Sequence, residues 1–393
     1  MSKNLVAGQS SCEASSQQGV RAALGASQTC DEASLAPSAT GASQLRRIFV
    51  AGLGAVSPAG WNVATLSAAL EKGEPLPTQP VARPGWEKTL QARPVPPPAT
   101  RLDFLAHPRL RRSSPITHYA AAASLEALAG LRAQPAGKNL RLGVVACLQS
   151  GCVQYSCRFY DETLKNPATA SPLVFPETVH AAPTSHVVAL LENVALAYTL
   201  VGDPSIFLQG LTLGAQWLEE NRVDACLVFG AEETNWIIAD AFWHLDRRAI
   251  VTAGAGALCL CRDPKLSIGV ELSAITDTHP YSARQHQTQA AQAMRRQLGK
   301  HSSNELLCDG LGSSPRADAA ERAAWSDWNG ARVSPKHILG EGMMAAAAWQ
   351  CVAACDALAE KKFPAANVSL VGSNQQAIGA RFVVGQASSL SSP

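Results

Sequence analysis

The pattern of apolar and polar positions is most regular over residues 201–233, VGDPSIFLQGLTLGAQWLEENRVDACLVFGAEE. Residues 205–208 form a short apolar run, residues 211–220 show helical spacing, and residues 225–229 are apolar at every position. A strand that is apolar on both faces belongs in the middle of a covered sheet. The pattern therefore predicts a strand–helix–strand unit at the centre of the fold.

The rest of the chain alternates between strands and helices in the same way. Before residue 263 we expect five strands, at residues 48–56, 140–148, 205–208, 225–230 and 255–261. After it we expect about five more, together with an almost wholly apolar helix over residues 342–360 that must be buried on all sides. This predicts an α/β fold with two similar halves of about five mixed strands each, which share buried helices.

Three segments follow from this division. Residues 1–45 are rich in Ser, Ala, Gly and Gln without an apolar period, which predicts a disordered tail. The two halves are expected at residues 46–262 and 263–388. Eight prolines between residues 75 and 98 predict an extended surface excursion. The glycines of AGAGAL at 253–258 predict close backbone packing, because no Gly-Lys-Ser/Thr follows them as a phosphate loop requires.

Composition excludes several classes of function. The chain has 33 Lys and Arg against 31 Asp and Glu, a net charge of +2, so nothing indicates nucleic acid or an anionic membrane as a partner. No apolar run approaches the roughly 18 residues that span a bilayer, and the N-terminus lacks the pattern of a secretory leader. We therefore expect a cytoplasmic protein without a membrane span.

The 11 cysteines are an odd number, and most lie in apolar runs. They are expected to be small buried side chains in a reducing compartment. Cys147, Cys152 and Cys157 recur every five residues, but no histidine stands at metal-ligand spacing. We expect neither a metal site nor a cofactor.

Six segments stand out by their order and spacing: VAGLGAVSPAG from residue 50, FPETV from 175, VGDPSI from 201, VDACLVFGAEE from 223, PKHILGEGMMAAAA from 335 and VGSNQQA from 371. Together they resemble the β-ketoacyl synthases of the thiolase fold, which condense acyl thioesters in fatty acid and polyketide synthesis. The resemblance extends over about residues 46–385. It implies a layered α-β-α-β-α fold with two pseudo-symmetric halves.

The chain departs from this family where the family has its chemistry. The family uses a cysteine at the strand-to-helix turn as acyl acceptor and two histidines that support decarboxylation and stabilise the enolate. The resemblance places Gln209 near the cysteine position. Asp309 stands in place of the first histidine, and Glu341 replaces the second in a pattern that keeps Lys336. The altered positions leave no recognisable route to a thioester intermediate.

The roles of these residues are predicted as follows. Gln209 is either a stand-in for the cysteine, as in chain length factors, which are inactive partners of ketosynthases, or a turn residue bonded to its own backbone. Asp309 and Glu341 are expected to be structural, with Lys336 as their ion-pair partner. His337 is expected to be a buried or capping side chain. Cys147 is expected to be a core residue, because no partner histidine is recognisable.

The resemblance implies a subunit that is not catalytic alone, similar to a chain length factor. It would pair with an active ketosynthase and an acyl carrier protein in fatty acid or polyketide-type biosynthesis, aryl polyenes included. The alternative is an enzyme, an acyltransferase, thioesterase or condensing enzyme with relocated catalytic residues. A self-associating scaffold is a third hypothesis. Trp217, Trp236 and Trp243 are the expected anchors of a subunit interface.

Overall fold

The computed structural model describes residues 47–385, except residues 138, 283–285, 313 and 373–375. The predicted tail at residues 1–45 and the end of the predicted second half at 386–388 lie outside the described residues.

Two sets of five strands have the same spatial order. The order is β5-β4-β6-β8-β1 in the first set and β12-β11-β13-β14-β9 in the second, so both read 3-2-4-5-1 when numbered along the chain. The first set comprises β1 (Ile48–Val56), β4 (Leu142–Leu148), β5 (Val194–Val201), β6 (Ala225–Glu232) and β8 (Gly254–Cys261). The second comprises β9 (Val270–Ile275), β11 (Leu306–Cys308), β12 (Ala331–Val333), β13 (Ala365–Val371) and β14 (Gln376–Val384), with the short β10 (His279–Pro280) on β14. The predicted fold of two similar five-stranded halves is confirmed.

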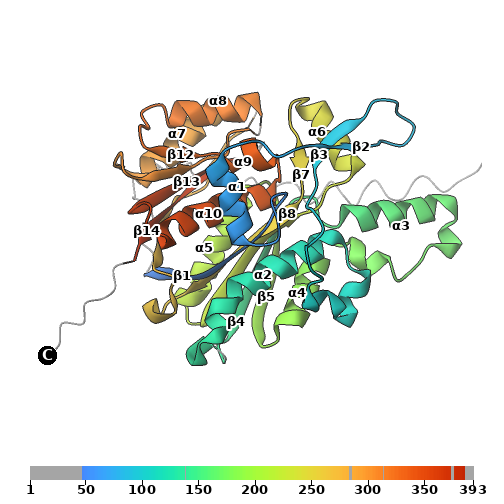
Figure 1. Cartoon of the computed structure of the whole chain (residues 1–393), viewed down its shortest axis with the longest axis horizontal. Coiled ribbons are helices and arrows are strands. Elements are labelled where there is room, and N and C mark those ends of the chain that lie inside the picture. The colour runs from blue at the N-terminus through green and yellow to red at the C-terminus, as the bar shows by residue number, and fades with distance from the viewer. Residues whose placement is uncertain (1–46, 138, 283–285, 313, 373–375, 386–393) are drawn as a thin grey trace, which may run out of the picture. The chain divides into compact units, whose positions relative to one another are not determined.

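The helices form three layers around these strands (Figure 1). α2 (Pro115–Ala133) and α4 (Ala182–Leu191) cover the outer face of the first set. α7 (Gln287–Leu298) and α8 (Pro315–Ala324) cover the outer face of the second. α5 (Ile206–Glu219) and α10 (Met344–Ala359) lie between the sets and contact strands of both. This is the layered α-β-α-β-α arrangement that the resemblance implies.

Helix α10 is buried on every side, as its apolar sequence predicts. Every residue from Met344 to Cys355 is buried. The helix can approach the sheet this closely because small residues face each other. A Cβ added at Gly256 of β8 would lie 2.7 Å from the Cβ of Ala348. The close backbone packing predicted for the glycine-rich segment is therefore confirmed.

The strand predicted at residues 205–208 is wrong. Ser205 directly precedes α5, and the next three residues form the first turn of that helix. The strand of this unit is β5, which lies at one edge of the sheet and is only partly buried. A short apolar run cannot be told from the start of a buried helix by apolarity alone.

The remaining elements lie around this core. The proline-rich segment is extended, as predicted, and forms β2 (Gln79–Val81) and β3 (Leu90–Arg93), which join β7 (Val251–Thr252) in a small sheet. The other α-helices are α1 (Val63–Lys72), α3 (Val153–Lys165), α6 (Trp236–Leu245) and α9 (Pro335–Leu339). The 3-10 helices are η1 (Asp103–Ala106), η2 (Pro108–Arg112), η3 (Pro135–Gly137), η4 (Pro167–Thr169), η5 (Phe175–Thr178) and η6 (Pro264–Leu266). None of the helices in the described ranges is long and apolar enough to cross a membrane.

Candidate functional site

The start of α5 carries a carboxylate at the place where the resemblance puts a nucleophile. Asp203 is only 3% exposed, and its Oδ1 accepts a hydrogen bond from the Ser205 backbone N–H at 3.1 Å and another from the Ser205 hydroxyl. Its Oδ2 packs so closely on Gly372 that a Cβ added there would lie 2.0 Å away. The N–H groups of a helix start can stabilise a developing anion. Here a fixed negative group already lies beside them, and the Ser205 hydroxyl is buried and engaged.

The backbone before α5 is relaxed, whereas the backbone before α10 is strained. Ser205 has φ −65° and ψ −20°, in the ordinary helical region. Met343, which directly precedes α10, has φ 49° and ψ −117°. Strain of this kind persists only where the surroundings fix it, and it is frequent at functional sites. At Met343, however, the buried side chain is a thioether that cannot act as an acyl acceptor.

Gln209 does not lie at the helix start, because it is one turn inside α5. Its Nε2 donates a hydrogen bond to Oε1 of Gln376 on β14 at 3.1 Å, so it is bonded to another side chain rather than to its own backbone. With Thr212, Gln216 and Thr276 it lines an open pocket of about 350 Å³. Gln209 therefore does not lie at the strand-to-helix turn, where the sequence analysis placed it; the residue that directly precedes α5 is Ser205.

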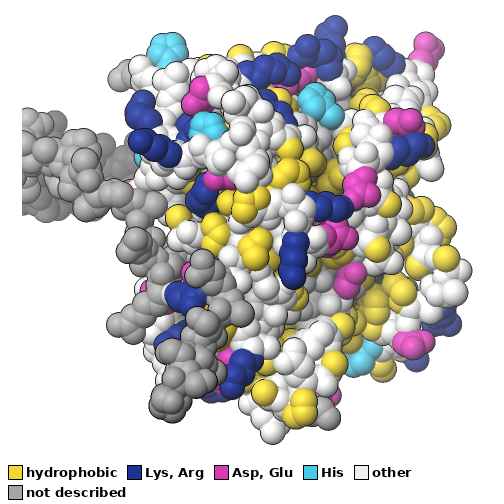
Figure 2. Space-filling model, turned by 60° about the vertical axis from the view of Figure 1, so that its left-hand side comes forward, with side chains coloured by type: hydrophobic (Ala, Val, Ile, Leu, Met, Phe, Trp, Pro, Cys, Tyr) yellow, Lys and Arg dark blue, Asp and Glu magenta, His cyan; other side chains and the backbone are white. Residues whose placement is uncertain are grey.

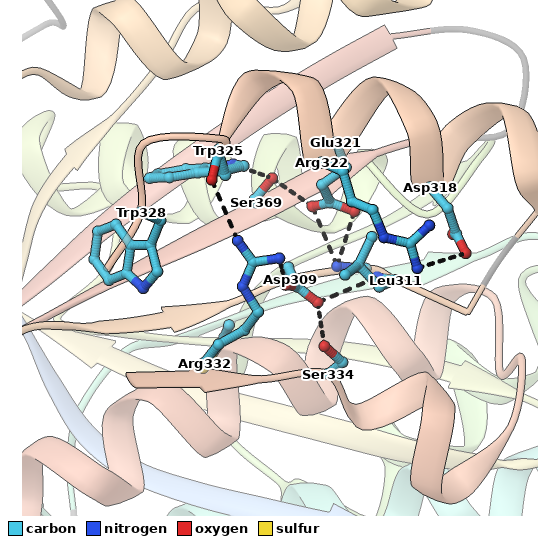
Figure 3. A network of polar contacts seen from close by, with 12 residues as sticks. Asp309, Leu311, Asp318, Glu321, Arg322, Trp325, Trp328, Arg332, Ser334 and Ser369 are labelled. Carbon is cyan, nitrogen blue, oxygen red and sulfur yellow. Dashed lines mark hydrogen bonds and ion pairs between the residues drawn. The ribbon is translucent and has the colours of Figure 1, made fainter. Parts of the chain in front are cut away.

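Asp309 lies in a buried polar network at the end of β11 (Figure 3). Its Oδ1 accepts hydrogen bonds from the Ser334 hydroxyl at 2.5 Å and the Leu311 N–H at 3.3 Å. Nη1 of Arg332 lies 3.3 Å from Oδ2. Burial raises the pKa of the Asp309 carboxyl, and Ser334 and Arg332 oppose that shift. The cation that faces Asp309 is therefore Arg332 of the edge strand β12, which the prediction of Lys336 as the shared partner overlooked.

Glu321 of α8 belongs to the same network, and sequence reasoning missed it. Its Oε1 accepts a hydrogen bond from the Ser369 hydroxyl at 2.5 Å, and its Oε2 accepts one from the Gly310 N–H at 3.1 Å. Burial, together with the charge of Asp309, raises the pKa of Glu321 well above its usual range. A signal was present in the sequence, because Glu321 lies on the alanine stripe that α8 turns inward, Ala317, Ala320 and Ala324.

Lys336 and Glu341 form the ion pair expected from the sequence. Nζ of Lys336 lies 2.8 Å from Oε2 of Glu341, and the two side chains are 5% and 3% exposed. Oε1 of Glu341 also accepts a hydrogen bond from the Met343 N–H at 2.7 Å. Glu341 therefore fixes the strained residue before α10 and is itself neutralised by Lys336.

An open pocket of about 440 Å³ reaches this ion pair. His337 lines the pocket and is exposed, contrary to the expectation of a buried or capping side chain. The short helix α9 turns its apolar side chains inward at Ile338 and Leu339, which leaves His337 on the solvent side. The charged groups around the pocket are Arg93, Asp246, Arg248, Asp318, Arg322, Lys336, His337 and Glu341.

The cysteines of the described residues line neither of these two pockets. Cys147 is fully buried at the end of β4, and its Sγ donates to the carbonyl of Ile206 at 3.8 Å. Burial raises the pKa of this thiol and that of Cys152, which precedes α3. In the described part of the chain, no cysteine is hydrogen bonded to a histidine, and no group of three or more His, Cys, Asp or Glu could hold a metal ion.

Large exposed apolar side chains gather in one stretch of the sequence, which we call the apolar surface. Those in the described residues all lie between positions 160 and 245, around α3, η5, β5 and α6: Tyr160, Leu164, Leu173, Phe175, Val179, Tyr198, Val201, Ile237 and Leu245. β5 is also an end strand, so one row of its backbone groups has no strand partner among the described residues.

The tryptophans expected at an interface lie differently. Trp217 is buried within the chain, 5.8 Å from the ring of Tyr198, so its expected role as an interface anchor is wrong. Trp236 and Trp243 are half-buried on α6, where the Nζ of Lys88 lies 3.6 Å from the Trp243 ring centre. The side chains that remain available to a partner are those of the apolar surface.

Known proteins match this chain in structure rather than in sequence. No protein-family model matches it, and no curated protein matches it in sequence. Three solved structures cover 86% of the chain. They are the ishigamide ketosynthase/chain length factor (18% identity, 99% of that chain, TM-score 0.70), a β-ketoacyl synthase from Burkholderia phymatum (17%, 100%, 0.71) and a ketosynthase in complex with its chain length factor from Xenorhabdus doucetiae (15%, 98%, 0.69). The chain has the thiolase-like fold of these proteins.

Proposed function

We propose that this chain is a non-catalytic ketosynthase-like subunit, comparable to a chain length factor. It pairs with an active ketosynthase and works with an acyl carrier protein in the synthesis of a fatty acid or polyketide-type product. The observation that carries this proposal is the closed start of α5, where the Asp203 carboxylate and the buried Ser205 hydroxyl bind each other. An acyl acceptor at this place would need a free nucleophile and uncommitted N–H groups.

The two histidine positions support the same proposal. Asp309 is held by Ser334 and Arg332, and Glu341 is held by Lys336 and the Met343 N–H. In the family, each of the two imidazoles donates an N–H hydrogen bond to the enolate oxygen. A carboxylate has no hydrogen to donate, and both carboxylates here are already bonded within the fold. A family member that had changed its mechanism but remained an enzyme could lose one of the cysteine and the two histidines. In this chain all three are replaced.

The apolar surface supports a protein partner. Exposed large apolar side chains and an open strand edge, such as that of β5, are both features of interaction sites. An obligate subunit interface buries more than about 2,000 Å² in total and is rich in such residues. Another structure of this fold is described as a polyketide acyl carrier protein in complex with its ketosynthase. Three exposed arginines of η2, Arg109, Arg111 and Arg112, offer an acidic carrier protein a positive contact.

Co-expression with an active ketosynthase from the same organism tests the proposal. We expect a 1:1 complex, and a change in the partner's activity or product length. Val201→Asp and Leu164→Asp place a charge in the apolar surface and should weaken the complex, while Ala319→Asp, at an exposed position on α8, should not. A monomer or pure homodimer in the presence of that ketosynthase, with unchanged products, would contradict the proposal.

Mass spectrometry separates this subunit from an enzyme with relocated residues. After incubation with an acyl-loaded carrier protein, we expect the mass of the chain to stay unchanged. A stoichiometric acyl adduct on Cys147, Ser205 or any other side chain would favour an acyltransferase or condensing enzyme instead.

A further inference from the structure

A third open pocket, of about 540 Å³, lies between the end of α7 and the end of α8. It is formed on the outer helical layer of the second strand set and adjoins the polar network of Figure 3 through Trp325, whose Nε1 donates a hydrogen bond to the Ser369 hydroxyl at 3.0 Å. Four of its side chains are basic, Arg295, Arg296, Lys300 and His301, and one is acidic, Asp327. α7 and α8 lie at the top of the molecule in Figure 1, and Figure 2 shows Lys and Arg side chains gathering along the upper edge of the neighbouring view.

A helix end accounts for only part of this charge. Arg295 and Arg296 lie in the last turn of α7, where cations are favoured by the negative end of the helix dipole. Lys300 and His301 lie beyond the helix and turn back on the same pocket. The pocket therefore collects more positive charge than the dipole of α7 requires.

Two tryptophans hold two of the cationic side chains in place. The guanidinium of Arg295 lies 4.3 Å from the ring centre of Trp325, and the imidazole of His301 is stacked on Trp328 at 4.6 Å. Nη1 of Arg295 donates a hydrogen bond to the Gly299 carbonyl at 2.6 Å, and Nη2 donates to Nδ1 of His301. These contacts fix the pocket before any ligand arrives, which reduces the entropy that binding costs.

The positive charge of the pocket is only weakly balanced. Asp327 lies 3.7 Å from Nη2 of Arg295 and is 66% exposed, so solvent screens that pair. The Arg295 side chain itself is 11% exposed, and its Nε is buried without a hydrogen-bond partner among the described residues. Burial lowers the pKa of Arg295, and the charges of Asp327 and Glu305 oppose that shift. Arg296 and Lys300 are exposed and make no ion pair with another described residue.

We propose that this pocket binds a phosphorylated small molecule, with the phosphate held by Arg295, Arg296 and Lys300. The planar fork of a guanidinium matches phosphate oxygens in pairs, and an ammonium adds a point charge. The volume lies within the range of about 300–1,000 Å³ that is usual for small-molecule sites. A flat acidic protein surface would reach the outer Arg296 and Lys300 but not the recessed Arg295. The proposal is independent of the subunit role proposed above.

Calorimetric titration of the purified full chain with pyrophosphate tests this site. We expect saturable binding at a Kd below about 1 mM, with weaker binding of inorganic phosphate and none of chloride at equal ionic strength. The Arg296→Gln/Lys300→Gln variant should weaken binding at least about tenfold, because two charge-assisted contacts are removed. Both positions are exposed, so the variant leaves the core intact.

Arg316→Gln provides the matched control, because Arg316 is an exposed arginine of α8 that does not line the pocket. It should leave pyrophosphate affinity unchanged. Equal weakening in this control would mean that binding follows net charge alone and would overturn the proposal. The same conclusion would follow if no saturation occurred below about 10 mM, or if poly-glutamate bound at this pocket and pyrophosphate did not.

Discussion

Lys336→Met would leave the Glu341 carboxylate buried without its cation. In the native chain the two charged atoms lie 2.8 Å apart and both side chains are almost fully buried. Removal of one partner of such a pair costs about 3–5 kcal/mol, because the other charge is left uncompensated. Glu341 keeps its hydrogen bond from the Met343 N–H and lines a pocket open to water. We therefore expect a loss of unfolding free energy near the lower end of that range, about 3 kcal/mol.

Urea-induced unfolding followed by tryptophan fluorescence measures this loss. The Lys336→Met/Glu341→Gln double variant is the matched control, because it removes the stranded charge together with the cation. It should be more stable than Lys336→Met alone. Lys72→Met breaks an ion pair with Glu74 in which both side chains are more than 60% exposed, and it should leave the midpoint unchanged. A Lys336→Met midpoint equal to that of the native chain, or a double variant less stable than the single one, would refute the reasoning.

Three further predictions concern other parts of the fold. Burial raises the pKa of Glu232 from 4.5 to about 7, so the folded state holds a proton that the unfolded state releases, and stability should fall as the pH rises from about 4.5 to 7. Glu232→Gln should flatten that dependence, and an unfolding midpoint that still falls equally between pH 5 and pH 8 would contradict it. Gly340→Ala should destabilise the fold much more than Gly73→Ala. Both glycines have a positive φ, and at Gly73 this left-handed backbone alone costs about 1–2 kcal/mol. At Gly340 the added Cβ would also lie 2.5 Å from the backbone oxygen of Ile250. Limited proteolysis should not release residues 46–262 and 263–388 as separately folded halves, because α10 of the second half packs on β6 and β8 of the first.

Segments that are buried on all sides could be predicted from the sequence. β6, β8 and α10 carry apolar residues at nearly every position, so their pattern depends on burial alone. β5, with the sequence VALAYTLV, is also apolar at nearly every position, but the sequence analysis did not assign it as a strand. Once β5 was missed, the apolar start of α5 took its place as a strand. That error moved the expected helix start from Ser205 to Gln209.

The polar network could be predicted only in part for a related reason. The Lys336–Glu341 pair is local, since its members are five positions apart in the sequence, and the sequence indicates it directly. Asp309 meets Arg332 and Glu321 only because parallel strands β11 and β12 and the helix α8 bring distant segments together. A three-residue strand such as β12 is too short to show a period. Arg332 of β12 could therefore not be identified from the sequence as the partner of Asp309.

If the chain is the non-catalytic subunit proposed above, the closed start of α5 makes a return to condensing chemistry unfavourable. Ser205→Cys alone would place a thiol beside the Asp203 carboxylate, which would raise the thiol pKa instead of lowering it. Glu341→His would then strand Lys336 and release the Met343 N–H, and Asp309→His would leave Arg332 without its counter-ion. Each single step back towards a condensing enzyme would cost stability before it restored any activity. The replaced residues are part of the interior packing, so a return to the family's residues would have to change several of them together.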